Sequence, residues 1–135
     1  MRQPKRQLHL PRPTDTELSI LRVLWQHGPG SVRETLKRFN EAQGAEAGYT
    51  TILKMLQIMT DKGLVERDDS QRPQVYRARL PQEQTQRQLV DDLLERAFGG
   101  SAKELVMQAL ASKETPEAEL AQIEMLLDKL EGGVE

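Results

Sequence analysis

The sequence of 135 residues contains no cysteine, only two histidines and few aromatic residues. The absence of cysteine excludes disulfides, thiolate metal sites and cysteine nucleophiles. The two histidines, His9 and His27, are far apart in the sequence and do not predict a metal or acid–base site. No apolar run is long enough to span a membrane, and the N-terminus lacks the apolar core of a signal peptide. These absences predict a cytoplasmic protein.

Hydrophobic residues make up 37% and aromatic residues 4% of the chain, which is lean for one large core. Two modest helical layers, or a core completed by a second copy of the chain, fit better. Residues 1–80 carry 14 Lys and Arg against 9 Asp and Glu, whereas residues 81–135 carry 5 against 12. A basic first half indicates a polyanionic partner, and the acidic second half indicates a different role. Chance variation in surface charge is the alternative.

The first 13 residues differ from the rest in composition. They hold four basic residues and three prolines but no acidic residue, which predicts a flexible basic arm rather than a helix. Two capping boxes then predict the starts of two helices, at Thr14 with Glu17 and at Ser31 with Glu34. The first helix is expected to end near Gly28, and the second is expected to be followed by a polar loop over residues 40–47.

Residues 48–62 predict a third helix, which Gly63 can end in the left-handed conformation. At helical spacing this segment has one apolar and one polar face. The apolar face comprises Ile52, Met55, Leu56 and Met59. The polar face comprises Thr50, Thr51, Lys54, Gln57 and Asp61. Hydroxyl, amide and ammonium groups can bond phosphates and base edges in a major groove, although an ordinary solvated helix face has the same composition.

After Gly63 the periodicity changes to that of strands. Residues 64–67 and 74–80 predict two strands, joined by a turn over residues 68–73. Three helices followed by such a hairpin, the wing, predict a winged helix-turn-helix domain over residues 14–80. Four arginines gather on the hairpin, namely Arg67, Arg72, Arg77 and Arg79. Their guanidinium groups can straddle phosphates or enter a minor groove, which favours double-stranded DNA as the partner.

Residues 81–135 predict three amphipathic helices with acidic outer faces. The first is expected to end at Gly99 and Gly100, the second to begin with a capping box at Ser101 and Glu104, and the third to begin near Pro116. The apolar stripes include Leu89, Leu93, Phe98, Leu120, Ile123, Leu127 and Leu130. Because these stripes are long and the chain is short, we expect a two-fold dimer rather than helices that fold back on the first domain. Two reading helices would then be about 34–36 Å apart along the DNA, or a multiple of that distance.

Three stretches of the first half resemble the DNA-binding domain of the BlaI/MecI/CopY family of bacterial winged-helix repressors. They are PTDTELSILRVLWQHGPGSVRETL, GYTTILKMLQIMTDKGLVERD and VYRARL. A fourth stretch, LLERAFGGSAKELVMQAL, is similar to the family's dimerisation helices, so the resemblance covers nearly the whole chain. It implies a mainly α-helical homodimer that binds an inverted repeat in a promoter and represses transcription.

The resemblance also implies DNA contacts at individual positions. The family's recognition-helix and wing positions correspond to Tyr49, Thr50, Thr51, Lys54, Arg72 and Arg77. The polar face and the hairpin described above add Gln57 and Arg67 as candidates. Ile58 stands where the family often has a basic residue. One phosphate or base contact would therefore be missing, or replaced by an apolar contact with a thymine methyl group.

In antibiotic-sensing members of the family, a membrane metalloprotease of the BlaR/MecR type signals, and the repressor's dimerisation region is cut at an Asn-Phe pair. The aligned pair here is Gln108-Ala109, so cleavage of this chain, and such a protease as its partner, are hypotheses. The copper-responsive branch uses a C-terminal cysteine motif. This chain has no cysteine, which argues against copper sensing.

These patterns predict a sequence-specific transcriptional repressor rather than an enzyme. The sequence has no carboxylate pair, nucleophile–base set, phosphate-binding glycine loop or metal-ligand spacing, so we expect no catalysis, no cofactor and no small-molecule ligand. The alternative is a winged helix used only for contact with other proteins. Salt separates the two interpretations, because a protein that neutralises six or more phosphates loses roughly 10³-fold in DNA affinity between 50 and 200 mM salt.

Overall fold

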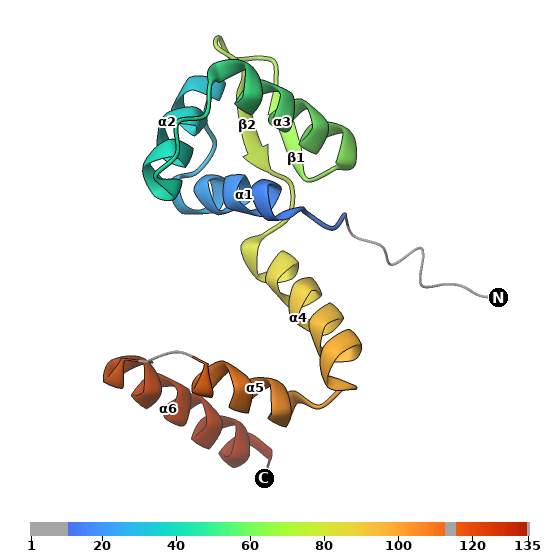
Figure 1. The fold of residues 1–135 in the computed structure, drawn as a ribbon, viewed down its shortest axis with the longest axis vertical. Coiled ribbons are helices and arrows are strands. Elements are labelled where there is room, and N and C mark those ends of the chain that lie inside the picture. The colour runs from blue at the N-terminus through green and yellow to red at the C-terminus, as the bar shows by residue number, and fades with distance from the viewer. Residues whose placement is uncertain (1–10, 113–115, 135) are drawn as a thin grey trace, which may run out of the picture. The chain divides into compact units, whose positions relative to one another are not determined.

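The first part of the chain is a winged helix-turn-helix domain, and further helices follow it (Figure 1), which confirms the predicted fold class. In this computed structural model residues 11–112 and 116–134 are described, with the backbone alone described at 127 and 130–134. The basic arm, predicted over residues 1–13, therefore lies outside the described residues except for its last three. The elements are, in order, α1 (Asp15–His27), α2 (Val32–Gln43), α3 (Tyr49–Lys62), β1 (Val65–Asp68), β2 (Val75–Ala78), α4 (Gln82–Phe98), α5 (Ala102–Ala111) and α6 (Glu117–Val134).

The first two helices begin at the predicted capping boxes. The Thr14 hydroxyl accepts the Glu17 N–H at 3.2 Å, and the Glu17 carboxylate accepts the Thr14 N–H at 2.9 Å. Ser31 and Glu34 repeat the same pair of bonds. Each box satisfies two backbone donors that a helix start otherwise leaves without partners, which is worth about 1 kcal/mol.

The end of α2 corrects one expectation. The polar loop was predicted over residues 40–47, but α2 continues to Gln43 and ends at Gly44, which adopts the left-handed conformation with φ of 61°. Asn40 lies in the last turn of the helix, and its side-chain amide bonds both the N–H and the carbonyl of Ala47. The polar character of Asn40 therefore serves to anchor the loop from within the helix.

The third helix agrees closely with its prediction. It runs between Gly48, the residue before its first turn, and Gly63, which ends it in the left-handed conformation with φ of 83°. The predicted strands are also present, but β1 is shifted by one residue and β2 is shorter than predicted. In their antiparallel register Val65 is opposite Ala78 and Arg67 is opposite Tyr76. The chain before α2 adds a bridge that was not predicted, because Gly30 exchanges two backbone hydrogen bonds with Tyr76 at 2.8 and 3.0 Å.

The hydrophobic core lies among α1, α2, α3 and the hairpin. Its members are Ile20, Leu21, Val23, Leu24, Val32, Phe39, Ile52, Leu56, Met59, Leu64, Val65 and Tyr76. Trp25 packs at the edge of the core, and its indole N–H donates to the Leu80 carbonyl at 3.1 Å. The predicted apolar face of α3 is confirmed, with Met55 partly buried beside the three fully buried residues. The core therefore determines which side of α3 faces solvent.

The chain divides into two compact units after Val90, so the first half of α4, with its buried Thr85, belongs to the first unit. In the second unit α5 begins after Ser101, whose hydroxyl accepts the Glu104 N–H; this is one of the two bonds that a capping box would have. The last helix continues through Gly132 and Gly133 to Val134. In the described part of the chain, no helix is long and apolar enough to cross a membrane.

Candidate nucleic-acid interface

The polar face of α3 is exposed to solvent. All of the contact residues predicted on this helix are exposed, namely Tyr49, Thr50, Thr51, Lys54 and Gln57. Thr50, Lys54 and Gln57 lie opposite Ile52, Leu56 and Met59, which are buried in the core, whereas Tyr49 lies at the edge of the buried face. Ile58 is exposed over 39% of its surface and adds an apolar side chain to the same polar face. The face thus offers hydroxyl, amide, ammonium and methyl groups, the set that base edges in a major groove can use.

The start of α3 is open to an anion. Gly48 precedes the first turn, and no side chain of the described residues caps it. The N–H groups of this turn therefore lack the side-chain acceptors that α1 and α2 have. Such groups carry the positive end of the helix dipole and bond readily to phosphate.

Arg33, in the first turn of α2, lies over the ring of Tyr49. Its Cζ is 5.2 Å from the ring centroid, a cation–π contact worth about 0.5–1 kcal/mol at an exposed site. The dipole of α2 disfavours a cation at this end of the helix, so the ring is what stabilises the guanidinium there. Within the described part of the chain, no carboxylate forms an ion pair with Arg33.

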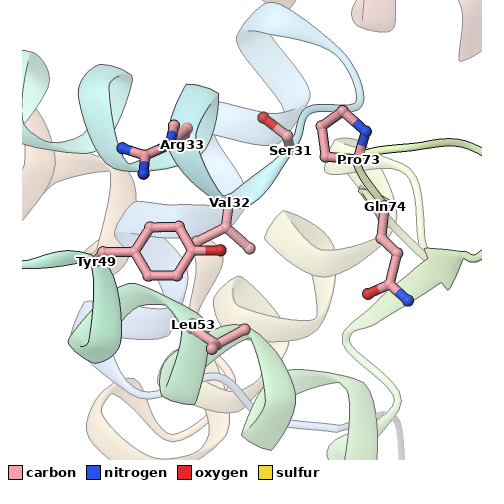
Figure 2. A pocket seen from close by; sticks show the side chains of 7 residues that line it. All are labelled: Ser31, Val32, Arg33, Tyr49, Leu53, Pro73 and Gln74. Carbon is pink, nitrogen blue, oxygen red and sulfur yellow. The ribbon is translucent and has the colours of Figure 1, made fainter.

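A cleft of about 210 Å³ lies beside this contact (Figure 2). It is lined by Ser31, Val32, Arg33, Tyr49, Leu53, Pro73 and Gln74. These residues come from the start of α2, the start of α3 and the end of the hairpin turn. In Figure 2 the ring of Tyr49 and the side chain of Leu53 lie across the opening from Pro73 and Gln74. The cleft therefore joins α3 to the wing.

The wing arginines pair with their neighbours. Arg67 Nε lies 2.7 Å from a carboxylate oxygen of Asp69, and Arg77 donates two hydrogen bonds to Glu66 at 2.9 and 3.1 Å. Arg72 donates to the Asp69 backbone carbonyl at 2.5 Å. From β1 to β2 the chain holds three arginines and three acidic residues, so this span is electrically neutral. The fourth predicted arginine, Arg79, follows β2 and donates to the Gly63 carbonyl at 3.2 Å. Ion pairs this exposed are weak and can exchange for a phosphate.

Asp68 closes the hairpin turn. Its carboxylate accepts the Ser70 hydroxyl at 2.6 Å, the Ser70 N–H at 2.9 Å and the Gln71 amide at 3.1 Å. These bonds, with those from Ser70 first, lower the pKa of Asp68 from an ordinary 3.8 to about 2. The carboxylate therefore stays ionised, and the turn stays closed, well below neutral pH.

An ion pair ties the end of α3 to the start of α1. Lys62 Nζ lies 2.7 Å from Glu17 Oε1, and Glu17 is only 2% exposed. Burial raises the pKa of Glu17, but the bonds from Lys62 and Thr14 outweigh burial, and the pKa lies below its ordinary value of 4.5. The same carboxylate thus caps α1 and holds α3 in position.

The structure brings some predicted residues together and separates others. Tyr49 lines the cleft together with Pro73 and Gln74, and Pro73 directly follows Arg72 in the sequence. Arg67 and Arg77 instead form ion pairs on the strands. Sequence reasoning missed Arg33 and Gln74. Arg33 has a local signal, because an arginine in the first turn of a helix is unfavourable beside the helix dipole. Gln74 has none, since only the folded hairpin brings it near α3.

The predicted dimerisation residues lie on the helices of the C-terminal region. Leu93 and Leu120 are exposed, and Leu89, Phe98 and Ile123 are partly exposed. The side chains of Leu127 and Leu130 lie outside the described residues. Further exposed apolar residues lie outside the predicted set of dimerisation residues, namely Val90, Val106, Met107, Leu110, Met125 and Leu126. The pair Gln108-Ala109 is exposed and lies in the last turn of α5.

Comparison with known proteins covers most of the chain. The sequence model of a family described as "Penicillinase repressor" matches residues 13–129. The match therefore covers both the winged helix-turn-helix domain and most of the C-terminal helices. No curated protein matches the chain.

Proposed function

Because the chain belongs to the penicillinase repressor family of DNA-binding transcriptional repressors, we propose that it acts as a homodimer on an inverted-repeat operator. Each copy would place α3 in a major groove and its wing on the neighbouring backbone or minor groove. The observation that carries the proposal is the exposed polar face of α3, whose orientation is set by the buried Ile52, Leu56 and Met59.

The contacts divide by chemistry. Thr50, Thr51, Lys54 and Gln57 can hydrogen-bond base edges, and Ile58 can contact a thymine methyl group. On the wing, Arg72 bonds backbone carbonyls and no carboxylate among the described residues, so it can turn to a phosphate without leaving a carboxylate unpaired. Arg67 and Arg77 would first have to exchange their carboxylates for phosphates. We therefore expect Arg72 to contribute more to DNA affinity than the other two.

Dimerisation rests on the exposed apolar side chains of the C-terminal helices. Leu93 and Leu120 are the described members of the predicted set that remain exposed in a single copy. Apolar surface of this kind marks an interaction site, and a two-fold dimer would set two copies of α3 against the two halves of an inverted repeat.

Derepression by proteolysis at Gln108-Ala109 is the proposed route of release, with a membrane metalloprotease as the sensor. Both residues are exposed, and they lie in the last turn of α5, where unwinding disturbs little of the helix. Immunoblotting of cells grown with and without a beta-lactam tests this route. A shortened product ending at Gln108 is expected, and a chain that stays full-length while its promoter is induced would eliminate cleavage.

Lys54→Ala tests the DNA-binding assignment. The side chain lies opposite the core, so the melting temperature should not change, while affinity for a duplex from the gene's own upstream region should fall about tenfold. Gel-shift titration at several salt concentrations measures both the loss and the salt dependence. If the parent protein binds this duplex without salt dependence, the protein-interaction adaptor becomes the better description. If parent and variant bind equally, Lys54 is not a contact residue.

A further inference from the structure

Arg33 differs from the arginines of the wing in what surrounds its guanidinium group. Arg67 and Arg77 each pair with a carboxylate, and Arg72 bonds carbonyls. Arg33 is exposed and is held by the face of the Tyr49 ring alone among the described side chains. A ring contact occupies none of the five N–H donors of the guanidinium. Arg33 is thus positioned and still able to bond an anion.

The cleft beside Arg33 combines apolar and polar surface. Val32 and Leu53 contribute apolar side chains, Tyr49 contributes its ring, and Gln74 contributes an amide. The Arg33 guanidinium lies over the Tyr49 ring at the rim of the cleft and points away from Gln74 in Figure 2. A deoxyribose-phosphate strand has the matching chemistry, since its sugar is largely apolar and its phosphate is an anion with several acceptors.

The position of the cleft indicates which phosphates of the DNA would lie beside it. One wall is α3, the element proposed to enter the major groove, and the other is Pro73 and Gln74 at the end of the hairpin turn. In duplex DNA, one sugar-phosphate strand separates a major groove from the next minor groove. A protein that reads the first groove with α3 and touches the second with its wing must straddle that strand, and the cleft lies between those two elements.

We propose that Arg33 binds a backbone phosphate of the operator, that Tyr49 positions it, and that the cleft receives the strand between α3 and the wing. This proposal rests on the proposed function. It gives Tyr49 a role other than direct base contact: the ring acts through Arg33 by stacking under its guanidinium. It also adds a phosphate contact on α2, which the sequence patterns did not indicate.

The test combines substitutions with salt titration on a duplex from the gene's own upstream region and on one of scrambled sequence. Arg33→Gln should weaken binding to both duplexes about tenfold. It should also lower the slope of log affinity against log salt by about 0.9, the contribution of one phosphate. Arg96→Gln is the matched control, because Arg96 is an exposed arginine of the second unit that pairs with Asp92. For Arg96→Gln the slope of log affinity against log salt should equal that of the parent protein.

Two substitutions of Tyr49 separate positioning from direct contact. Tyr49→Phe keeps the ring and should bind like the parent, whereas Tyr49→Leu should lose about two- to fivefold in affinity. In the Arg33→Gln background Tyr49→Leu should have no further effect. If Tyr49→Phe is as weak as Tyr49→Leu, or if the two losses add, Tyr49 touches DNA itself and the positioning role is overturned.

Single neutral methylphosphonates placed along the operator locate the contact. One position in each half-site should weaken the parent and leave Arg33→Gln unaffected. If the parent binds with the expected salt dependence but Arg33→Gln has the same slope and the same sensitivity at every position, the Arg33 proposal alone fails. If the parent shows no salt dependence, the proposed function fails and this proposal fails with it.

Discussion

The two units of the chain differ in how far their apolar side chains are buried. In the first unit, hydrophobic residues from Ile20 to Tyr76 form a core of nearly inaccessible side chains. In the second, no described side chain is buried, and Leu93, Leu120 and Met125 are exposed over 46%, 38% and 70% of their surface. Burial of apolar surface is the main favourable term in folding. The first unit therefore has its own source of stability, whereas the second has apolar surface left over for a partner.

This difference in burial fits the two parts of the proposed function, DNA reading and dimerisation. A repressor that reads base edges needs a recognition helix held rigidly by its scaffold, and α3 has the core behind it and the Lys62–Glu17 pair at its end. A dimerisation region needs apolar surface that only a second copy covers, because its stability should depend on association. Three changes in the protein and one in the operator test this division. Three of them concern the first unit and one concerns the second, and they follow in order of decreasing effect.

Leu56→Ala should have the largest effect on folding. Leu56 is fully buried in α3, and truncation of such a leucine costs about 2–5 kcal/mol of unfolding free energy. Urea denaturation followed by circular dichroism measures the loss. It should be the same at low and high protein concentration, because the cavity lies inside one copy. A loss that shrinks as protein concentration rises would mean that the first unit also depends on the dimer.

Leu120→Asp should have the next largest effect, on association rather than on the core. A charge placed on a predicted dimer surface that is 38% exposed in one copy should weaken the dimer about a hundredfold. Sedimentation velocity over a range of concentrations measures the shift. Met125→Asp, at a more exposed position of the same helix, is the comparison. If Met125→Asp dissociates the dimer and Leu120→Asp does not, the exposed residues that the sequence patterns missed form the interface.

Glu17→Gln should reduce the stability of the first unit by about 1–2 kcal/mol at neutral pH, a value discounted for the partial exposure of Lys62. Glutamine can still cap α1, so the change isolates the Lys62 pair. The folded-state pKa of Glu17 lies below its ordinary value of 4.5. The pair's contribution is therefore fully present above the unfolded pKa and is lost as pH falls through the lower, folded pKa. Unfolding measured from neutral to acid pH should show the two proteins converging. If the two proteins still differ in stability at acid pH, the loss comes from packing and not from the ion pair.

Replacement of thymine by deoxyuracil in the operator should have the smallest effect. Removal of a methyl group that Ile58 contacts should cost about 0.5–1 kcal/mol of binding free energy. The loss should occur at one position per half-site and be absent in Ile58→Ala. Competition gel-shifts with singly substituted duplexes measure it. An equal loss in parent and variant would show that another side chain, or none, meets the methyl group.

The sequence predicted the elements of the first unit well, because their signals are local. Thr14 with Glu17, and Ser31 with Glu34, bond within one turn of their own helices, and the spacing of Ile52, Leu56 and Met59 alone indicates the buried face of α3. The errors lie where a local signal has two interpretations. A polar Asn40 suits a loop, but it also suits the last turn of a helix from which it can bond Ala47.

By itself, the sequence determined which helix presents a polar face and which residues stand on it, because helical periodicity depends on neighbours three and four positions apart. Only the tertiary structure decided what those residues have beside them. The contact of Arg33 with Tyr49, the cleft closed by Gln74 and the pairing of Arg77 with Glu66 all join residues from different elements. Their distances follow from how the core packs α2, α3 and the hairpin together. The same holds for the apolar residues of the second unit, whose spacing is visible in the sequence but whose exposure depends on what folds against them.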